Sequence, residues 1–488
     1  MPDSTISNPS NTAGVVIAVD HPAAGDAAAG AGIPGQPIPP VSRPEERAAA
    51  SARRAAFPYH FPRDRRKLGG KFSVEENARR LLRFFYFERR LAHGIGSWTL
   101  AIAELEVKIE TGRHLFWHAD AARRLRERLN EQEKRLDVID DFRDAEIDVV
   151  IDEMLSAADT PELLVGVHQV IGQALETAYR HHIDDTDPVA DAPTIRLMRQ
   201  VLLDYEPMLA WAEDAIAAYI EGGVDESRLE AWRWHLARVL ASIGGVTGAD
   251  ERTARPTPLR TDRQPYRRGE IPRRDSRFTS FTHTGDYNSA DGEPRHEPGS
   301  YEDERLRFVR AQRDELDAIE AFGTFLWDIR FKDFQAEYDL ARITWDESRH
   351  TEMGQRLLMQ MGYDPYELPN RLTSSTCRGP MEPEYAMAEI NLFGEVGVLK
   401  TISGLIQVAR RRDDSAVAHV SDFIRSDERT HVRKGQHIIR CMTSLGMQDL
   451  EQRTRELFTE CLVSLGAFRK DMDLFTLTRE ELERYIGE

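Results

Sequence analysis

The chain has few cysteines and lacks a long apolar run. Its three Cys are Cys377, Cys441 and Cys461, an odd number with no Cys-x-x-Cys pair. Such spacing predicts a reducing compartment and no disulfide framework. No 18 consecutive residues are apolar, and the first 30 lack the basic start of a signal peptide. We therefore expect a cytoplasmic protein without a membrane span.

An excess of positive charge is also missing. Asp and Glu number 83 against 65 Lys and Arg, which gives a formal net charge of −18. General nucleic-acid binders and proteins that bind membrane surfaces usually carry the opposite sign, so both classes are disfavoured. The sequence has no nucleotide or flavin motif either. If the protein is a redox enzyme, its electron donor must be a separate protein.

Strand signals are absent from the first half of the chain, and long amphipathic runs take their place. Ser73 followed by Glu76 is typical of a helix start. The helical periodicity that follows predicts an all-α fold. The expected helices span roughly 74–93, 97–134, 143–157, 161–183, 191–222 and 226–242.

Composition divides the chain into four segments. Residues 1–72 form an arm rich in Ala, Pro and Gly that we expect to be disordered. Residues 73–248 and 303–488 are two helical domains, as the chain length suggests. Residues 249–302 form a linker with nine Arg against three acids between positions 252 and 277. We expect this linker to wrap over the acidic helices as a strap, with phosphate binding or coverage of a site as alternatives.

Two near-copies of one motif carry the chemistry. Asp-Glu-x-x-His occurs at residues 346–350 and again at 427–431. Residues three apart lie on one helix face, so each motif presents a carboxylate beside an imidazole. Both Glu residues also sit in the middle of an apolar helical stripe, where an unpaired charge is costly. A metal ion bound by both side chains removes that cost. The pattern therefore predicts two of the four helices around a carboxylate-bridged metal pair.

Such a centre needs one more carboxylate from each partner helix. Glu320 lies on the apolar line of the preceding helix, 27 residues before Glu347. Glu315 is about 140° away from it around the helix, so only one of the two can point inward. Before the second motif, Glu395 is flanked by glycines, and Glu389 is its rival. We prefer Glu320 and Glu395, with Glu315 and Glu389 as alternatives.

The order Glu, Glu-x-x-His, Glu, Glu-x-x-His over residues 306–440 resembles the ferritin-like di-iron carboxylate superfamily. Within it, the segment is most similar to a bacterial branch of uncharacterised ferritin-like proteins and to the tRNA-hydroxylase-like branch. The resemblance implies a four-helix bundle that binds two Fe ions, with Mn as the alternative. It implies that Asp346 and Asp427 hydrogen-bond the second ring nitrogen of the histidine ligands. The implied metal ligands are Glu320, Glu347, His350, Glu395, Glu428 and His431.

The resemblance also implies a class of activity. The expected function is an oxygenase or oxidase that activates O2, or handles peroxide, and acts on a substrate that the sequence does not identify. A homodimer would be compatible with it. One alternative is a metal-binding or peroxide-handling protein. Another is a non-catalytic helical protein that binds partners and whose buried Glu and His are paired without metal.

The first helical domain has a similar layout of long helices but lacks the motif. Glu176 and Glu206 fall near the corresponding places, and Leu209 occupies the histidine position. Glu110 and His114 share a helix face and could still bind a metal. We expect instead a duplicated ferritin-like bundle that lost its metal and now serves packing or dimerisation.

Overall fold

The structure is a computed structural model that describes residues 43–62, 68–256, 258–262, 264–278, 281–282, 295–371 and 373–464. It forms two compact units, Met1–Lys67 and Leu68–Glu488. In the first unit, the described residues include helix α1 (Pro44–Ala55), none of whose side chains is buried. Residues 1–42 of the arm that we expect to be disordered lie outside the described residues.

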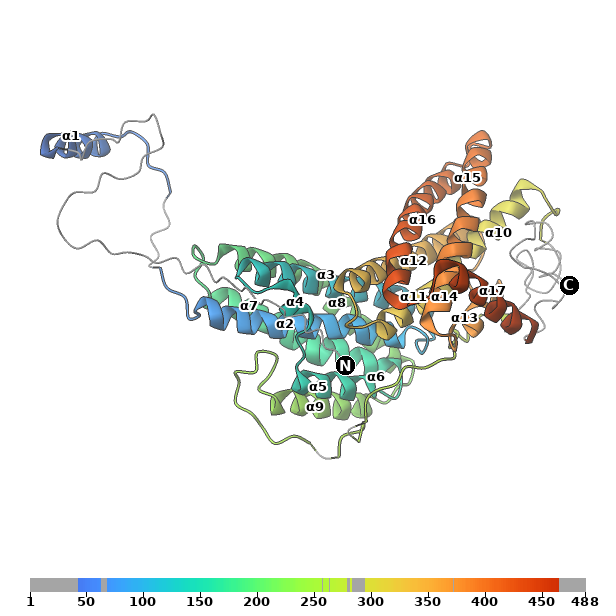
Figure 1. Ribbon diagram of the computed structural model, residues 1–488, viewed down its shortest axis with the longest axis horizontal. Coiled ribbons are helices and arrows are strands. Elements are labelled where there is room, and N and C mark those ends of the chain that lie inside the picture. Colours follow the sequence, from blue (N-terminus) through green and yellow to red (C-terminus); the bar gives the residue numbers. More distant parts are fainter. Residues whose placement is uncertain are drawn as a thin grey trace, which may run out of the picture. The chain divides into compact units, whose positions relative to one another are not determined.

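The second unit is helical, which confirms the all-α prediction (Figure 1). Ser73 caps its first helix as predicted, because its hydroxyl accepts a hydrogen bond from the Glu76 amide at 3.2 Å. The elements of the first half are α2 (Val74–Trp98), α3 (Leu105–Glu131), α4 (Leu136–Asp140), α5 (Ala145–Leu155), α6 (Thr160–Leu164), the π-helix η1 (Val165–Gly172), α7 (Gln173–Asp185), α8 (Ala192–Glu221) and α9 (Glu226–Ser242).

The second half continues with helices, apart from one short strand pair. Strand β1 (Phe281–Thr282) pairs in parallel with β2 (Asn370–Arg371). The sequence also predicts a helix near residues 479–485, and this segment lies outside the described residues. The helical elements are α10 (Tyr301–Arg313), α11 (Leu316–Asp328), α12 (Phe334–Gln360), α13 (Thr373–Arg378), α14 (Pro383–Glu389), the π-helix η2 (Ile390–Gly394), α15 (Glu395–Arg411), α16 (Ser415–Met442) and α17 (Met447–Ser464).

One hydrophobic core joins the two helical halves. Helices α2 and α3 pack against α11 and α12, and buried side chains from all four belong to the same cluster. Phe116 of α3 stacks on Trp345 of α12 with ring centroids 4.8 Å apart. Helices α2 and α11 cross so closely that a β-carbon on Gly96 would lie 2.5 Å from the carbonyl oxygen of Gly323. Helix α12, which carries the first motif, and its neighbour α11 are therefore braced by the first half of the chain.

The arginine-rich linker lies over acidic helices, which confirms the expected strap over its described residues. Its side chains form ion pairs with acids on α3, α5, α6 and α11. Each pair joins an arginine of the extended segment to a carboxylate of a helix, so the linker fastens both halves. These pairs are Arg252–Glu146, Arg260–Glu162, Arg268–Asp328 and Arg277–Glu106.

Two of the three cysteines are paired, contrary to the expectation from sequence. A disulfide joins Cys377 of α13 to Cys461 of α17, while Cys441 is free. The two partners are 84 residues apart. Only the packing of α17 beside α13 and α14 brings them together. No sequence spacing indicates this contact.

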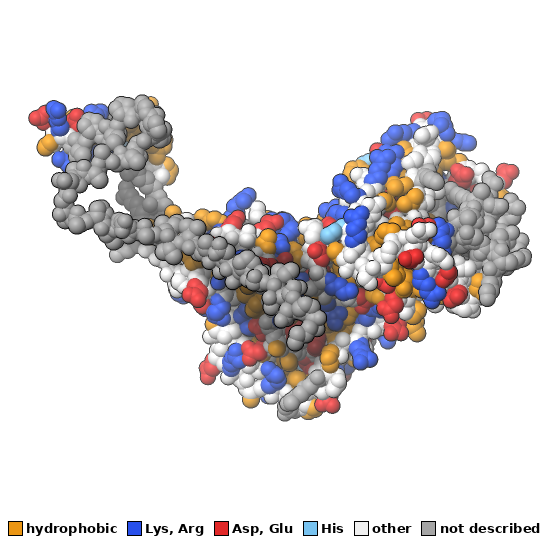
Figure 2. All heavy atoms as spheres, in the orientation of Figure 1, with side chains coloured by type: hydrophobic (Ala, Val, Ile, Leu, Met, Phe, Trp, Pro, Cys, Tyr) orange, Lys and Arg blue, Asp and Glu red, His pale blue; other side chains and the backbone are white. Residues whose placement is uncertain are grey.

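One helical stretch, Pro383–Arg411, is long and apolar enough to cross a membrane by length and composition. It comprises α14, η2 and α15, and 29% of its most apolar window is buried. It also carries two buried carboxylates, Glu389 and Glu395. In Figure 2, Lys and Arg side chains lie beside hydrophobic ones over α15 and α16. The absence of a membrane span remains a prediction.

Candidate metal centre

Two groups of ligand-type side chains meet between four helical segments. Glu315, Glu347, His350 and Glu428 can bring one ligand atom each within 4.8 Å of one another. Glu347, Glu395, Glu428 and His431 do the same. Glu347 of α12 and Glu428 of α16 belong to both groups. Each group adds one carboxylate and one imidazole of its own, which is the composition of a carboxylate-bridged metal pair.

Both imidazoles point their Nδ1 atoms at the shared carboxylates. His350 Nδ1 lies 3.3 Å from Glu347 Oε2 and 3.6 Å from Glu428 Oε1. His431 Nδ1 lies 3.1 Å from Glu347 Oε1 and 3.2 Å from Glu428 Oε2. Each shared carboxylate therefore turns one oxygen toward each imidazole. That division of oxygens is what a carboxylate bridging two ions requires.

The two unshared carboxylates complete the groups at either end. Glu315 Oε2 lies 2.9 Å from His350 Nδ1. Glu395 Oε1 lies 3.9 Å from His431 Nδ1. The centre thus has a pseudo-symmetric arrangement, with one terminal carboxylate and one imidazole on each side of the shared pair.

The outer nitrogens of both imidazoles face the aspartates that precede the two motif glutamates. His350 Nε2 lies 3.3 Å from Asp427 of α16, and His431 Nε2 lies 3.5 Å from Asp346 of α12. Each aspartate thus serves the histidine of the opposite helix. Arg349 joins the two, because its Nη1 lies 2.5 Å from Asp346 and 3.1 Å from Asp427. This network fixes the ring orientations and turns both Nδ1 atoms toward the carboxylates of the centre, where a metal would bind.

Three buried atoms of the centre, Glu315 Oε2, Glu347 Oε1 and His350 Nδ1, make no hydrogen bond of good geometry among the described residues. Each still lies close to a ligand-type atom of the centre: Glu315 Oε2 is 2.9 Å from His350 Nδ1, and Glu347 Oε1 is 3.1 Å from His431 Nδ1. A metal ion bound among these atoms would coordinate all three. Four carboxylates and two imidazoles form a hard and borderline donor set that suits Fe and Mn. The residues present therefore fit a pair of such ions.

Burial and like charge disturb the protonation of the carboxylates. Burial, together with nearby Glu347 and Glu428, raises the pKa of Glu315 to about 8. Burial and the neighbouring Glu428 raise the pKa of Glu395 well above its usual value. Burial also opposes the charged form of Glu347, but His350 and His431 outweigh it and lower its pKa to about 2. Burial opposes the charged form of both imidazoles, but the surrounding carboxylates, Glu315 and Asp427 for His350 and Asp346 and Glu347 for His431, outweigh it and raise the pKa of both imidazoles well above its usual value. Without metal, the two imidazoles and the terminal carboxylates are thus the groups that hold protons.

Metal binding should therefore strengthen as the pH rises from 6 to 8. Groups with raised pKa values are protonated below those values, and their protons must leave before a metal can bind. Each displaced proton changes the apparent affinity by about tenfold per pH unit. Competition titrations with a chromophoric chelator at pH 6, 7 and 8 would measure this dependence. An affinity for Mn²⁺ that does not change over that range would contradict the assigned ligands.

The structure does not place Glu320 in the centre, and Glu315 takes the expected position. The Glu320 carboxylate pairs with Lys108 and Arg274 and accepts a hydrogen bond from Ser375 Oγ at 2.7 Å. The preference for Glu320 came from its apolar helix line. Helix α11 is buried on nearly all sides, so that line does not distinguish the metal face from the face that packs against α3.

The choice between Glu395 and Glu389 agrees with the prediction. Glu389 lies outside the centre and pairs with Arg378 Nε at 2.7 Å. The π-helix η2 separates the two glutamates and changes the helical phase just before Glu395. Insertions of this kind are common beside functional sites. Here the π-helix aims Glu395 inward and leaves Glu389 on another face.

A break between α10 and α11 presents Glu315, and Gly354 makes room for it. Glu315 is the N-cap residue of α11, just after α10 ends at Arg313. A β-carbon on Gly354 of α12 would lie 2.2 Å from the backbone nitrogen of Arg313. The backbone at the break therefore lies directly against α12, one turn beyond His350.

Gly354→Ala should accordingly destabilise the protein by about 2 kcal/mol, because the clash involves backbone atoms that cannot rotate away. Displacement of the break should also weaken binding of the ion next to Glu315. Gly397→Ala is the matched control, since it lies in exposed helix with nothing within 4 Å of its β-carbon. The Gly397→Ala control should gain about 0.5–1 kcal/mol of folding stability. Urea denaturation measures both values; equal stability of the two variants would contradict the close contact.

The first half of the chain contains a buried cluster of hydrogen-bonded polar side chains. Glu88 is buried and bonds to His118 at 2.6 Å, Tyr205 at 2.7 Å and Tyr179. His114 and His168 bond to each other at 3.1 Å. Of the other sequence candidates, Glu110 pairs with Arg113, Glu176 pairs with Arg180, and Glu206 is exposed. Among the described residues, none of these belongs to a group that could hold a metal ion.

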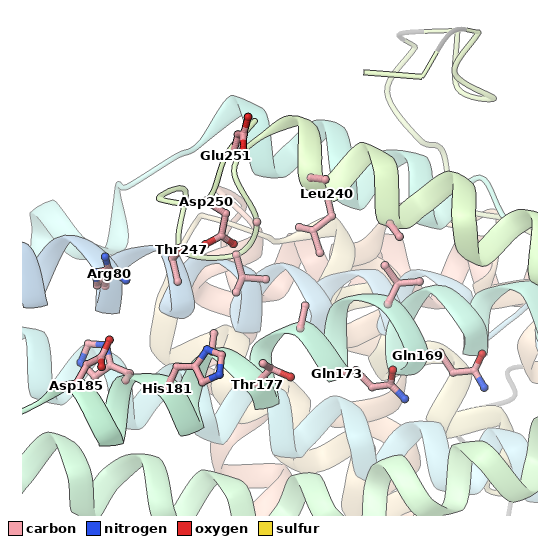
Figure 3. A pocket seen from close by; sticks show the side chains of 18 of the residues that line it. Arg80, Gln169, Gln173, Thr177, His181, Asp185, Leu240, Thr247, Asp250 and Glu251 are labelled. Carbon is pink, nitrogen blue, oxygen red and sulfur yellow. The ribbon is translucent and has the colours of Figure 1, made fainter. Parts of the chain in front are cut away.

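The first half also contains a cavity of about 670 Å³. His181, Thr177, Gln173 and Gln169 line one side of it, opposite the segment with Asp250 (Figure 3). No ligand-type residue of the metal centre lines this cavity. The cavity therefore does not form a chamber next to the centre.

Comparisons with family models, curated proteins and solved structures find no match for this chain. Its function is therefore inferred from side-chain geometry.

Proposed function

We propose that this protein is a ferritin-like di-iron oxidoreductase whose centre binds two Fe ions, or two Mn ions, and reacts with O2 or peroxide. The proposal is carried by one observation: Glu347 and Glu428 belong to both ligand groups and turn one oxygen toward each imidazole. Two ions held side by side require this division of oxygens.

The proposed ligand set assigns a role to each side chain. Glu347 and Glu428 would hold both ions, Glu315 and His350 would complete the ligands of one, and Glu395 and His431 those of the other. Four protein ligands per ion would leave coordination positions open for an oxygen donor. When reduced, such a pair would supply electrons to O2. Asp346 and Asp427 hold each imidazole in the orientation that presents Nδ1.

The four carboxylates balance the charge of two divalent ions, so the loaded centre is close to neutral. Arg349 offsets part of the negative charge of Asp346 and Asp427 outside the ligand set. With metal bound, the carboxylates of the centre can therefore stay ionised although they are buried. Metal ligation requires this ionised form. A separate protein would supply the electrons for the reaction.

Oxygen consumption tests the redox part of the proposal. Protein loaded with Fe²⁺ under argon is mixed with air-saturated buffer in an oxygen electrode. Wild type should consume O2 in proportion to bound iron and faster than the same amount of free Fe²⁺. The Glu389→Gln variant, which removes a buried carboxylate outside the centre, should behave like wild type. The Glu347→Gln variant should consume O2 no faster than the same amount of free Fe²⁺.

Other outcomes favour the alternative functions. Two bound ions without accelerated O2 consumption would favour metal binding or peroxide handling, and catalase assays of the Mn form would then decide. A folded wild-type protein that binds no metal would favour a helical protein that binds partners through its surfaces.

A further inference from the structure

A second cluster of ligand-type side chains lies outside this centre. Asp333, His437 and Cys441 can bring one atom each within 4.8 Å of one another. Asp333 is the N-cap residue of α12, whereas the other two lie on α16. His437 is six residues beyond His431, so the cluster is about 9 Å further along the helix. It shares no residue with the carboxylate centre.

The local structure holds all three side chains in place. His437 and Cys441 are four residues apart and therefore share one face of α16. Asp333 Oδ1 accepts a hydrogen bond from the Ala336 amide at 2.7 Å, which fixes its carboxylate at the start of α12. Cys441 is the one free cysteine among the described residues. Three different donor types thus meet where the start of α12 adjoins the end of α16.

The distances match the edges of a tetrahedral metal site. Cys441 Sγ lies 3.7 Å from His437 Nε2, and that nitrogen lies 3.3 Å from Asp333 Oδ1. With zinc bonds of about 2.3 Å to sulfur and about 2.0 Å to nitrogen or oxygen, tetrahedral geometry gives edges of about 3.5 Å and about 3.3 Å. These two spacings are therefore already close to those that an ion would impose, and the third pair of atoms lies within 4.8 Å.

A catalytic triad does not explain this arrangement. In such a relay, the acid bonds to one ring nitrogen and the nucleophile to the other. Here both the Cys441 sulfur and the Asp333 oxygen approach the same nitrogen, Nε2. A ring nitrogen carries either a proton or a lone pair. Nε2 therefore cannot donate a hydrogen bond to Asp333 and accept one from Cys441 at the same time. Convergence of the three atoms around one point is what a shared ion would produce.

We infer that Asp333, His437 and Cys441 form a mononuclear site for Zn²⁺ or a similar borderline ion. The His437 and Asp333 side chains are 45% and 39% exposed, so water can reach the fourth coordination position. Three protein ligands with one open position are typical of exchangeable or reactive zinc sites rather than of closed structural ones. The ion would also join the start of α12 to the end of α16, the two helices that carry the Glu-x-x-His motifs.

Cobalt spectroscopy tests the inference on the full-length protein, without thiol reductants so that the Cys377–Cys461 disulfide stays intact. Co²⁺ bound to a thiolate has an intense charge-transfer band in the near ultraviolet, which carboxylate and imidazole ligands do not produce. Wild type should develop this band, and its intensity should stop rising once one Co²⁺ ion per chain has bound at this cluster. Added Zn²⁺ should displace the Co²⁺ and remove the band.

Four variants identify the side chains that produce the band. Cys441→Ser and His437→Gln should abolish it, and Asp333→Asn, which can still cap α12, should weaken Co²⁺ binding at least tenfold. Glu428→Gln should keep the band, because it alters only the carboxylate centre. A wild-type protein without the band would overturn the inference. So would a band that survives in His437→Gln or disappears in Glu428→Gln, with thermal melting used to confirm that each variant is folded.

Discussion

Glu428→Gln is expected to remove both metal ions from the centre, whereas Glu395→Gln should remove about one. Glu428 belongs to both ligand groups, and its two oxygens face different imidazoles. An amide offers one weak oxygen donor and cannot bridge two ions. Glu395 approaches only His431 among the two imidazoles. Loss of this terminal ligand therefore spares the ion beside His350.

Metal content per chain measures this difference. Protein loaded with Fe²⁺ under argon and freed of excess metal should contain about two ions in wild type. The count should approach zero in Glu428→Gln and about one in Glu395→Gln. Glu389→Gln is the matched control, because it is a buried carboxylate in the same helical run that pairs with Arg378. Equal losses in Glu428→Gln and Glu395→Gln would contradict the distinction between shared and terminal ligands.

Glu320→Gln is expected to cost about 3 kcal/mol of folding free energy while it leaves the metal content unchanged. Its carboxylate pairs with Lys108 and Arg274, and all three side chains are at most 4% exposed. Removal of one partner leaves a buried positive charge uncompensated, which typically costs about 3–5 kcal/mol. Arg274 keeps its second partner, Asp317, so we expect the lower end of this range.

Glu315→Gln should show the reverse behaviour. It should lose about one ion per chain and keep more of its stability than Glu320→Gln does, because Glu315 pairs only with His350 among the described residues, whereas Glu320 pairs with Lys108 and Arg274. Chemical denaturation and metal analysis of the two variants, made side by side, separate the roles. A loss of metal in Glu320→Gln without a loss of stability would restore the sequence-based ligand assignment.

The motif positions were predictable because three kinds of pattern agree on them. In each motif, the i, i+3 spacing, the apolar stripe and the preceding aspartate all place Glu and His on one buried face. The structure brings Glu347, His350, Glu428 and His431 together accordingly. For these residues, local helix geometry alone determines the direction of the side chain.

Glu315 was not predictable in the same way. Its direction depends on the break between α10 and α11 and on the close approach of that break to Gly354, which are tertiary features. A continuous helix drawn through residues 315–320 gives two equally buried faces and no reason to prefer the correct one. The choice between Glu315 and Glu320 also depends on the side chains that pair with Glu320. Lys108 and Arg274 come from α3 and from the linker, far away in sequence.

The same limit applies to the second cluster and to the disulfide. Asp333 lies 104 residues before His437, and Cys377 lies 84 residues before Cys461. Only the packing of α12 against α16, and of α13 against α17, makes these residues neighbours. By contrast, the strap was predictable from charge alone. The linker sequence has a large excess of arginine, and its described residues Arg252, Arg260, Arg268 and Arg277 pair with carboxylates of the helices.

Anomalous diffraction from crystals loaded with Fe²⁺ or Mn²⁺ would test the central claim most directly. The bridged centre predicts two peaks about 3.5–4 Å apart between Glu347 and Glu428. One peak should lie next to His350 Nδ1 and the other next to His431 Nδ1. A single peak, or none at this place in a fully loaded crystal, would contradict the claim that the four helical segments are built around a pair of ions.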